Sequence, residues 1–150
     1  MNKEVLLTIT GLQLSQDDED YTEMIAPGEY YFRGGKHYFL YEEVTEGFVE
    51  TTKCTIKLDD AGKMMELTKK GVTNVHMIFE VNQKNDSFYY TPYGSLQIGI
   101  DGKKIEIEKG EDQMKVCVDY GLEMNYEHLA NCKITILAKN RGSEGFRLVK

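Results

Sequence analysis

Residues 113–126, QMKVCVDYGLEMNY, contain the longest alternation of apolar and polar side chains in the chain. One set is Met114, Val116, Val118, Tyr120, Leu122, Met124 and Tyr126, and the other is Lys115, Cys117, Asp119, Gly121, Glu123 and Asn125. A period of two is typical of a β-strand, because successive side chains point to opposite faces. At roughly 3.3 Å per residue this strand would be about 40 Å long, so we predict a bend near Gly121. Long bent strands form the corners of small closed barrels, and this stretch therefore indicates a barrel.

Shorter stretches with the same alternation cover much of the remaining chain. They include VLLTITG (5–11), TTKCTIKL (51–58) and NVHMIFEV (74–81). Turn signals rich in Gly, Asp and Asn lie between the stretches, at 34–35, 59–62, 85–86 and 101–102. Short connections of this kind make consecutive strands antiparallel neighbours. The sequence therefore predicts an antiparallel meander of about eight to ten strands.

Helix is predicted only as single turns, within SQDDEDYTEMIAPG (15–28) and within NYEHLANC (125–132). The length of 150 residues is typical of one domain, and the chain contains no internal repeat or linker. An antiparallel meander has two edges, and closure into a barrel removes both of them. We therefore expect an all-β fold, with a single β-barrel domain over residues 1–150. Two packed sheets are the alternative.

Charge and cysteine content limit the partners and the compartment. The chain has 18 Lys and Arg against 25 Asp and Glu, a net charge of −7, so no nucleic-acid partner is expected. The basic tail KNRGSEGFRLVK (139–150) is interpreted as a solvated strand end. The first residues have a strand pattern without a signal or membrane segment, and no membrane partner is expected. Cys54, Cys117 and Cys132 are odd in number and form no CxxC pair, which favours a reducing, cytoplasmic location.

No specific catalytic or cofactor motif occurs in the sequence. It lacks GxGxxG, the P-loop, HExxH and GxSxG. His37, His76 and His128 lie on separate segments, and each is interpreted as a surface or hydrogen-bonded structural histidine. The acidic run 17–20 lacks the spacing of an EF-hand loop, and Cys117 has no histidine base in its pattern. We expect no metal and no cofactor, and an enzyme is the least favoured class of protein.

The ten tyrosines supply the remaining candidate site. Those predicted to point inward with aliphatic residues are Tyr30, Tyr38, Tyr90, Tyr120 and Tyr126. For the segments YYFR (30–33) and HYFLYEE (37–43) the pattern leaves open which face is inward. In FYYTPYGSL (88–96), proline lacks an amide hydrogen and Gly94 tolerates positive φ, so residues 91–94 are interpreted as a sharp corner near a barrel mouth. The first hypothesis is therefore a barrel that binds a small amphipathic molecule at its mouth. The predicted lining residues are Tyr93, Tyr90, Tyr120 and Arg33.

Two alternatives to a ligand site remain open. The barrel can fill its interior with its own side chains, as small barrels do. The second hypothesis is then a structural or protein-interaction module, with a homodimer as one form. Such a module would use an aromatic patch on the opposite strand face, made of Tyr31, Phe39 and Tyr41.

Several stretches together resemble a known family. They are KEVLLTITGLQ (3–13), HYFLYEE (37–43), Phe79–Glu80, Thr91–Gly94 followed by LQIGI (96–100), and VDYGLEM (118–124). They resemble the YwiB-like family, a domain of unknown function found in bacterial β-barrel proteins. The resemblance covers nearly the whole chain and implies a closed antiparallel barrel of the lipocalin or calycin type, a fold whose other members bind small apolar ligands.

The resemblance implies no activity, cofactor or catalytic residue. The family pattern has an arginine before His76, where this chain has Lys69–Lys70–Gly71–Val72. Any role of that arginine would be absent here or would be served by a lysine.

Overall fold

The computed structural model describes residues 3–11, 23–92, 94–124 and 126–141. These residues form ten β-strands, and no helix occurs among them. The strands are β1 Glu4–Thr10, β2 Glu23–Arg33, β3 Lys36–Val44, β4 Thr51–Asp59, β5 Met64–Lys70, β6 Asn74–Glu80, β7 Lys84–Thr91, β8 Gly94–Lys109, β9 Gln113–Met124 and β10 Glu127–Asn140.

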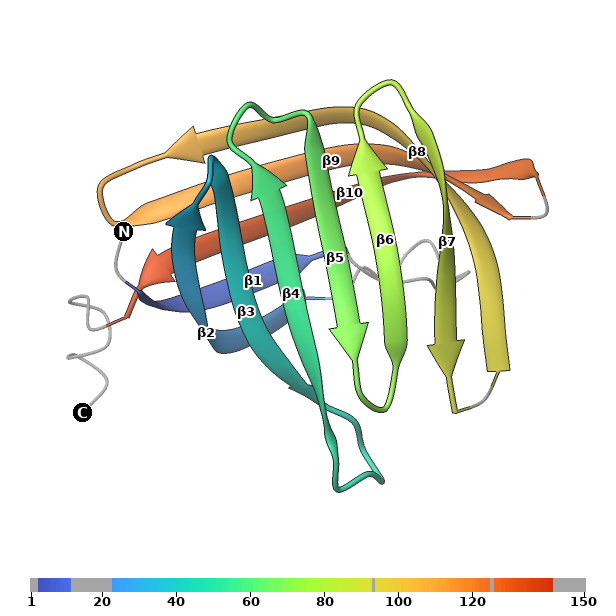
Figure 1. The fold of residues 1–150 in the computed structure, drawn as a ribbon, viewed down its shortest axis with the longest axis horizontal. Helices are drawn as coiled ribbons and strands as arrows, with labels where there is room; N and C mark the ends of the chain where they lie inside the picture. The colour runs from blue at the N-terminus through green and yellow to red at the C-terminus, as the bar shows by residue number, and fades with distance from the viewer. Residues whose placement is uncertain (1–2, 12–22, 93, 125, 142–150) are drawn as a thin grey trace.

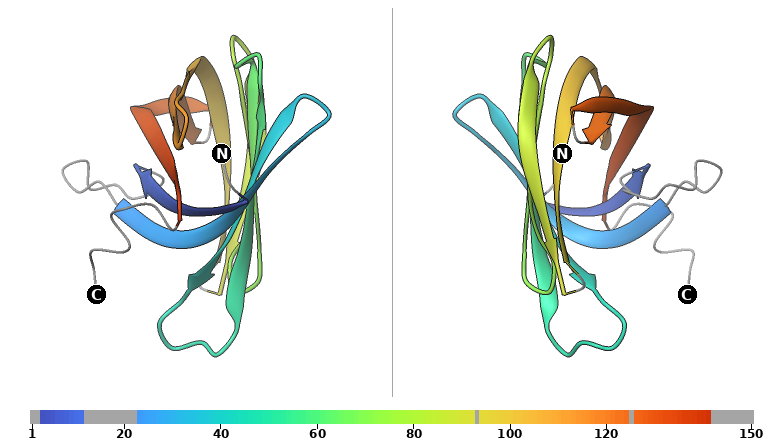
Figure 2. Two further views of the ribbon diagram at one scale, coloured as in Figure 1. Left: turned by 90° about the vertical axis from the view of Figure 1, so that its left-hand side faces the viewer. Right: turned by 90° about the vertical axis from the view of Figure 1, so that its right-hand side faces the viewer.

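The strands form a closed antiparallel barrel, which confirms the predicted fold class. Each strand pairs with the next along the chain, and β1 pairs with β10 from Val5–Asn140 to Thr10–Thr135. Figure 1 shows β3 to β7 side by side at the front, while β9, β10 and β1 cross behind them. The side views in Figure 2 show the same two layers edge-on. The alternative of two separate packed sheets is excluded, because the ladder returns to its first strand.

The interior of the barrel is a continuous apolar core. On β9 the inward set begins with Met114, Val116 and Val118 and continues through Tyr120 and Leu122, as the alternation predicts. The equivalent sets of the other strands meet them, and these residues lie in one buried cluster. The middle of the barrel is therefore filled by its own side chains, and space for another molecule can exist only towards the ends.

The corner predicted near Gly121 is formed by the neighbouring strand. The register between β8 and β9 shifts between Gly102 and Lys104, opposite Tyr120. A Cβ atom at Gly102 would lie 2.0 Å from the carbonyl oxygen of Glu80, so only glycine fits at this bulge. The first part of β8 pairs with β7 and the rest pairs with β9 alone among the described strands, so β8 connects the two layers.

Three local predictions were wrong, and a fourth, the helical turn within 15–28, is tested only over residues 23–28. The predicted turn 85–86 lies inside β7, and the predicted turn 101–102 lies at the bulge of β8. The chain reverses instead at 81–83, where Asn82 adopts a φ of 64°, which asparagine tolerates. Residues 23–28 and 127–132 were predicted within helical turns and are strand, because β1 and β9 supply their hydrogen-bonding partners. Residues 15–22 lie outside the described part of the chain.

The meander places the strand connections at two ends of the barrel. The hairpin end holds the connections that follow β2, β4, β6 and β8. The mouth holds the connections that follow β3, β5, β7 and β9. The β3–β4 connection extends beyond the others at the mouth (Figure 1).

Candidate functional site

A cavity opens at the mouth because β2 and β3 separate before either strand ends. Their ladder stops at Gly28 opposite Tyr41. Beyond that point, within the described residues, 23–27 of β2 pair only with β1, and 42–44 of β3 pair only with β4. The two strands therefore leave a gap that opens towards the mouth.

Pro27 lies at the point of separation and explains why the ladder ends there. The amide of Tyr30 donates to the carbonyl of Lys3, on the β1 side, at 2.7 Å. Successive amides of a strand point to alternate sides, so the backbone nitrogen of residue 27 faces β3. Proline has no hydrogen on that nitrogen and cannot donate to the β3 ladder.

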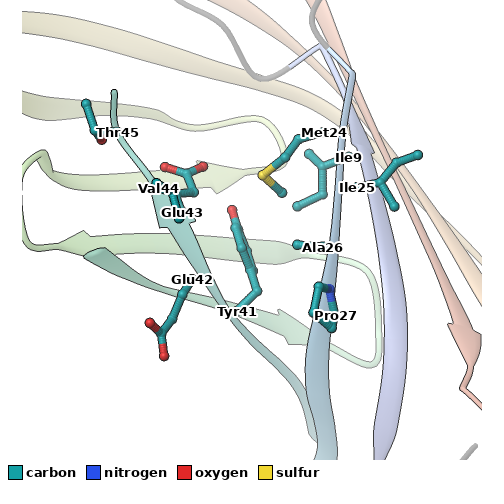
Figure 3. A pocket seen from close by; sticks show the side chains of 10 residues that line it. All are labelled: Ile9, Met24, Ile25, Ala26, Pro27, Tyr41, Glu42, Glu43, Val44 and Thr45. Carbon is teal, nitrogen blue, oxygen red and sulfur yellow. The ribbon is translucent and has the colours of Figure 1, made fainter. Parts of the chain in front are cut away.

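The cavity between the separated strands has a volume of about 480 Å³. It is lined by Ile9, Met24, Ile25, Ala26, Pro27, Tyr41, Glu42, Glu43, Val44 and Thr45. Figure 3 shows Met24 and Ala26 facing Tyr41 across the space, whereas Ile25 and Glu42 point away from it. Small-molecule sites usually have volumes of about 300–1,000 Å³ and mostly apolar walls, and this cavity has both properties.

An ion pair between Glu43 and Lys69 forms the charged part of this region. Nζ of Lys69 donates to both carboxylate oxygens of Glu43, at 2.9 and 3.2 Å. The Lys69 side chain is 9% exposed and that of Glu43 is 26% exposed. Alternation explains the burial of Lys69, which follows Met65 and Leu67 on the inward face of β5. Because both ions are largely removed from water, each depends on the other to compensate its charge. Together they carry no net charge.

The hydroxyl of Tyr41 is buried next to this ion pair. It makes no hydrogen bond of normal geometry with the described residues, and Figure 3 shows it pointing towards Met24 and Glu43. Burial is the main cause that raises the pKa of Tyr41, and the thiol of Cys54 and the carboxylate of Glu43 raise it further. The hydroxyl therefore keeps its proton. A buried hydroxyl without a partner costs about 1–3 kcal/mol, and such groups are rare in folded proteins. The hydroxyl can donate to, or accept from, a group that enters the cavity.

Cys54 lies beside Tyr41 and is an unreactive thiol. It is 1% exposed, and its Sγ donates to the carbonyl of Thr52 at 3.7 Å. Burial and the carboxylate of Glu43 raise the pKa of Cys54 to about 12, although Lys69 opposes them. Since the thiolate is the nucleophilic form, Cys54 does not give the cavity a nucleophile at neutral pH.

A second hollow, of about 540 Å³, lies on the outer face of β5, β6 and β7. Phe88 and Tyr90 project into it and stack, with ring centroids 6.1 Å apart and an interplanar angle of 11°. Its other lining residues are Thr68, Lys69, Lys70, Asn74, Val75 and His76. Phe88 and Tyr90 are each about half exposed, so this hollow is an open surface feature, in contrast to the mouth cavity.

The predicted lining residues do not meet in one pocket. Tyr93 lies outside the described residues. Tyr90 points outward, contrary to the prediction, and belongs to the outer hollow. Tyr120 is a core residue, 2% exposed, with its ring edge-on to Phe79. Arg33 ends β2 at the hairpin end, away from the mouth. A ligand-binding role for these residues stays a prediction.

The predicted aromatic patch of Tyr31, Phe39 and Tyr41 does not exist as an exposed surface. Phe39 and Tyr41 are 0% and 4% exposed and point into the barrel, while Tyr31 is on the outer face. Tyr38 was predicted to point inward and instead stacks on Tyr31, with ring centroids 4.7 Å apart. Tyr126 was also predicted inward and is 89% exposed in the β9–β10 turn. Neighbouring residues on both faces of these strands are aromatic or apolar, so alternation alone could not assign the inward face.

At the hairpin end, His37 is the hydrogen-bonded structural histidine that the sequence predicted. It is 3% exposed, its Nδ1 accepts from the Tyr30 hydroxyl at 2.7 Å, and its Nε2 donates to Asp60 at 2.7 Å. Lys109 also donates to Asp60, and these bonds from Lys109 and His37 lower the pKa of Asp60. His76, which bonds to Glu66, is exposed.

The described residues contain no grouping of His, Cys, Asp and Glu that could hold a metal ion. Cys54, Cys117 and Cys132 form no disulfide within the described residues. Among the same residues, no helix has the length and apolar character needed to cross a membrane. The acidic run 17–20 lies outside the described part of the chain.

The sequence interpretation missed the cavity residues Met24 and Glu43 and the ion-pair partner of Glu43, Lys69, and it treated Tyr41 as a surface aromatic. Two signals were available. Pro27 lies within a strand, where proline marks an edge or an end of pairing. Lys69 has the same parity as the apolar residues of β5 and falls where the family resemblance predicts an arginine, so a buried cation could have been expected there.

Comparisons with known proteins agree with this fold. The family described as "Domain of unknown function (DUF1934)" matches residues 7–136. No curated protein matches the sequence. The crystal structure of the ywiB protein from Bacillus subtilis is similar, with a TM-score of 0.69 and 16% sequence identity over 91% of this chain and 89% of that chain. At this identity the likeness shows the barrel fold alone.

Proposed function

Because the chain belongs to the DUF1934 family, whose function is unknown, we propose its function from the cavity itself: the barrel binds a small amphipathic molecule at its mouth. The observation that carries this proposal is the buried Tyr41 hydroxyl, which lines a cavity of about 480 Å³ and makes no hydrogen bond of normal geometry within the described part of the chain. Folding leaves this group unsatisfied at a cost, and a ligand that bonds to it would recover that cost on binding.

The walls of the cavity suit a molecule with an apolar body and one polar end. Ile9, Met24 and Ala26 present apolar surface on one side. Each Å² of apolar surface that the ligand removes from water contributes roughly 25 cal/mol. The flexible side chain of Met24 can adapt to different shapes. The polar end would lie opposite, beside Tyr41 and Glu43.

The fluorescent probe N-phenyl-1-naphthylamine, which is amphipathic and uncharged, tests this proposal. We expect its fluorescence to rise and saturate at one molecule per protein. Ala26→Leu, which adds bulk at the cavity wall, should abolish the rise. Phe88→Ala is the matched control, because it removes an aromatic side chain from the outer hollow and leaves the mouth unchanged. Loss of binding in Phe88→Ala with full binding in Ala26→Leu would refute the mouth site.

A second candidate function, a protein-interaction module with a homodimer as one form, is favoured by exposed apolar side chains at the end of β3 and on the β3–β4 connection. Val44, Phe48 and Val49 are 81%, 37% and 102% exposed. Exposed apolar groups that lie together are typical of interaction surfaces. Light scattering at micromolar concentration would support this candidate if it showed a dimer that Val44→Ser with Val49→Ser converts to a monomer. A monomer at all concentrations would count against self-association.

The proposal includes a reducing, cytoplasmic location. The three cysteines form no disulfide within the described residues, and disulfides are rare in reducing compartments. The binding proposed here uses hydrogen bonds and apolar contact only, and it requires no catalytic residue and no cofactor.

A further inference from the structure

We infer that the ligand presents an uncharged hydrogen-bonding head group, of the hydroxyl type, to Tyr41 and Glu43. This inference rests on the proposed function and names the class of molecule that the mouth cavity takes. It follows from the charge balance of the cavity wall and from the hydrogen-bonding capacity of its polar atoms.

The charges of the Glu43–Lys69 ion pair beside the cavity already compensate each other. Both carboxylate oxygens of Glu43 accept from Lys69, and this cation is almost fully buried. Glu42, the other charged residue that lines the cavity, points away from it (Figure 3). Among the described residues, no unpaired charge therefore points into the cavity.

A charged head group would break this balance. A ligand carboxylate would compete with Glu43 for Lys69 and would place two negative charges around one cation. A ligand ammonium would compete with Lys69 for Glu43 and would place two cations around one carboxylate. In a partly buried site such like-charge pairs are poorly screened, and the charged ligand would also lose its own hydration.

A hydroxyl group matches the free hydrogen-bonding capacity. Each carboxylate oxygen of Glu43 has two lone pairs, and Lys69 takes one on each oxygen. A ligand hydroxyl can donate to one of the remaining lone pairs and accept from the hydroxyl of Tyr41, which makes no other bond of normal geometry with the residues that the structure describes. Both bonds form without displacing the ion pair. The apolar tail would then lie against Ile9, Met24 and Ala26.

Three probes of equal chain length separate the head groups: octan-1-ol, octanoate and octylammonium, each titrated at pH 7. The readout is the NMR signals of the Met24 methyl group and the Tyr41 ring, which identify the cavity. We expect octan-1-ol to bind at least about tenfold more tightly than either ion, which corresponds to 1.4 kcal/mol or more. Equal or tighter binding of octanoate or octylammonium would overturn the inference and leave the proposed function standing. If none of the three probes shifts these signals, both the inference and the proposed function are refuted.

Two variants test the reason for this preference. Tyr41→Phe removes the hydroxyl and should weaken octan-1-ol binding about fivefold, the effect of losing one neutral hydrogen bond. Unchanged affinity would overturn the role of Tyr41 in recognising the head group.

Glu43→Gln leaves Lys69 without its anion and should shift the preference to octanoate by tenfold or more. A folded Glu43→Gln protein that still prefers octan-1-ol would show that the ion pair does not set the selectivity. If Glu43→Gln does not fold, the result for Tyr41→Phe alone tests the inference. Tyr41→Phe leaves every hydrogen bond of the ion pair in place.

Discussion

His37 and Tyr41 lie on the same face of β3, one near each end of the barrel, and both are almost completely buried, at 3% and 4% exposure. Both ring nitrogens of His37 have hydrogen-bonding partners, in Tyr30 and Asp60. The hydroxyl of Tyr41 has none of normal geometry among the described residues. At the hairpin end the buried polar group is part of the architecture, and at the mouth it faces a cavity. The difference identifies the mouth as the end where another molecule can bind.

The separation of β2 from β3 is the physical cause of this difference. At the hairpin end the two strands stay paired, and Tyr30 and His37 come within hydrogen-bonding distance. At the mouth the ladder has ended, and Tyr41 faces Met24 and Ala26, which offer it no polar atom (Figure 3). An early end of one ladder therefore creates both the cavity and the unsatisfied hydroxyl.

The largest expected effect comes from the ion pair at the mouth. Lys69→Met should lower the free energy of unfolding by about 3 kcal/mol, because it leaves the partly buried carboxylate of Glu43 without its cation. Urea denaturation at pH 7 measures the loss. Lys70→Met is the matched control on the next residue, which is exposed, and its effect should stay within about 0.5 kcal/mol. Equal losses in the two variants would contradict the assignment of Lys69 to a buried pair.

The same substitution at the two ends should have opposite consequences for stability. Tyr30→Phe should lower the free energy of unfolding by about 1–2 kcal/mol, because it leaves Nδ1 of buried His37 without its donor. Tyr41→Phe should leave the free energy of unfolding unchanged or raise it by up to about 1 kcal/mol, because it removes an unsatisfied buried hydroxyl. Chemical denaturation of both variants under one condition makes the comparison. Similar losses in both would mean that the two ends do not differ in this way.

The mouth should lose stability at alkaline pH. The pKa of Cys54 is raised from its ordinary 9.0 to about 12, first by burial and then by Glu43. A raised pKa in the folded state stabilises the protein fully below pH 9.0, and this contribution is lost as the pH rises towards 12. Between pH 8 and 9.5 the folding equilibrium constant of the wild type should fall a few-fold, and it should fall less in Cys54→Ala. Chemical denaturation of both proteins at several pH values in this range measures the difference. Parallel curves for the two proteins would remove Cys54 from the alkaline transition.

The hairpin end should lose stability at acidic pH, with the smallest effect of the four. Hydrogen bonds from Lys109 and His37 lower the pKa of Asp60 below its ordinary 3.8. A lowered pKa in the folded state stabilises the protein above pH 3.8, and this contribution is lost as the pH falls through the folded value. Asp60→Asn should therefore reduce the acid dependence of the unfolding free energy between pH 5 and 2.5 while leaving the alkaline dependence unchanged. An unaltered acid dependence in Asp60→Asn would show that the hydrogen bonds from Lys109 and His37 do not lower the pKa of this carboxylate.

Much of the fold could be predicted because its signal is local. The alternation in 113–126 corresponds to β9 and the beginning of the β9–β10 connection, and the turn at 34–35 lies where the pattern placed it. The inward face of β3 could not be predicted, because HYFLYEE has apolar side chains on both faces. A shift of one residue exchanges the two faces of a strand, so Phe39 and Tyr41 were assigned to the surface although they are buried.

Less of the candidate site could be predicted from the sequence, because its residues are far apart in the chain. Glu43 and Lys69 are separated by 26 positions, and their contact depends on the register of β3 with β4 and of β4 with β5. Tyr90 and Tyr120 have the residue type of a binding site, but β7 turns one outward and β9 turns the other into the core.

The sequence by itself determined that the chain forms antiparallel strands, because alternation with a period of two and short connections permit few other arrangements, and it favoured closure into a barrel over two packed sheets. Only the tertiary structure decided where the barrel is filled and where it is hollow. That depends on where the ladder of β2 and β3 ends, at Gly28 next to Pro27, and on which side chains of other strands then face Tyr41. Hydrogen-bonding partners of buried groups are long-range contacts in a barrel, and a local pattern does not specify them.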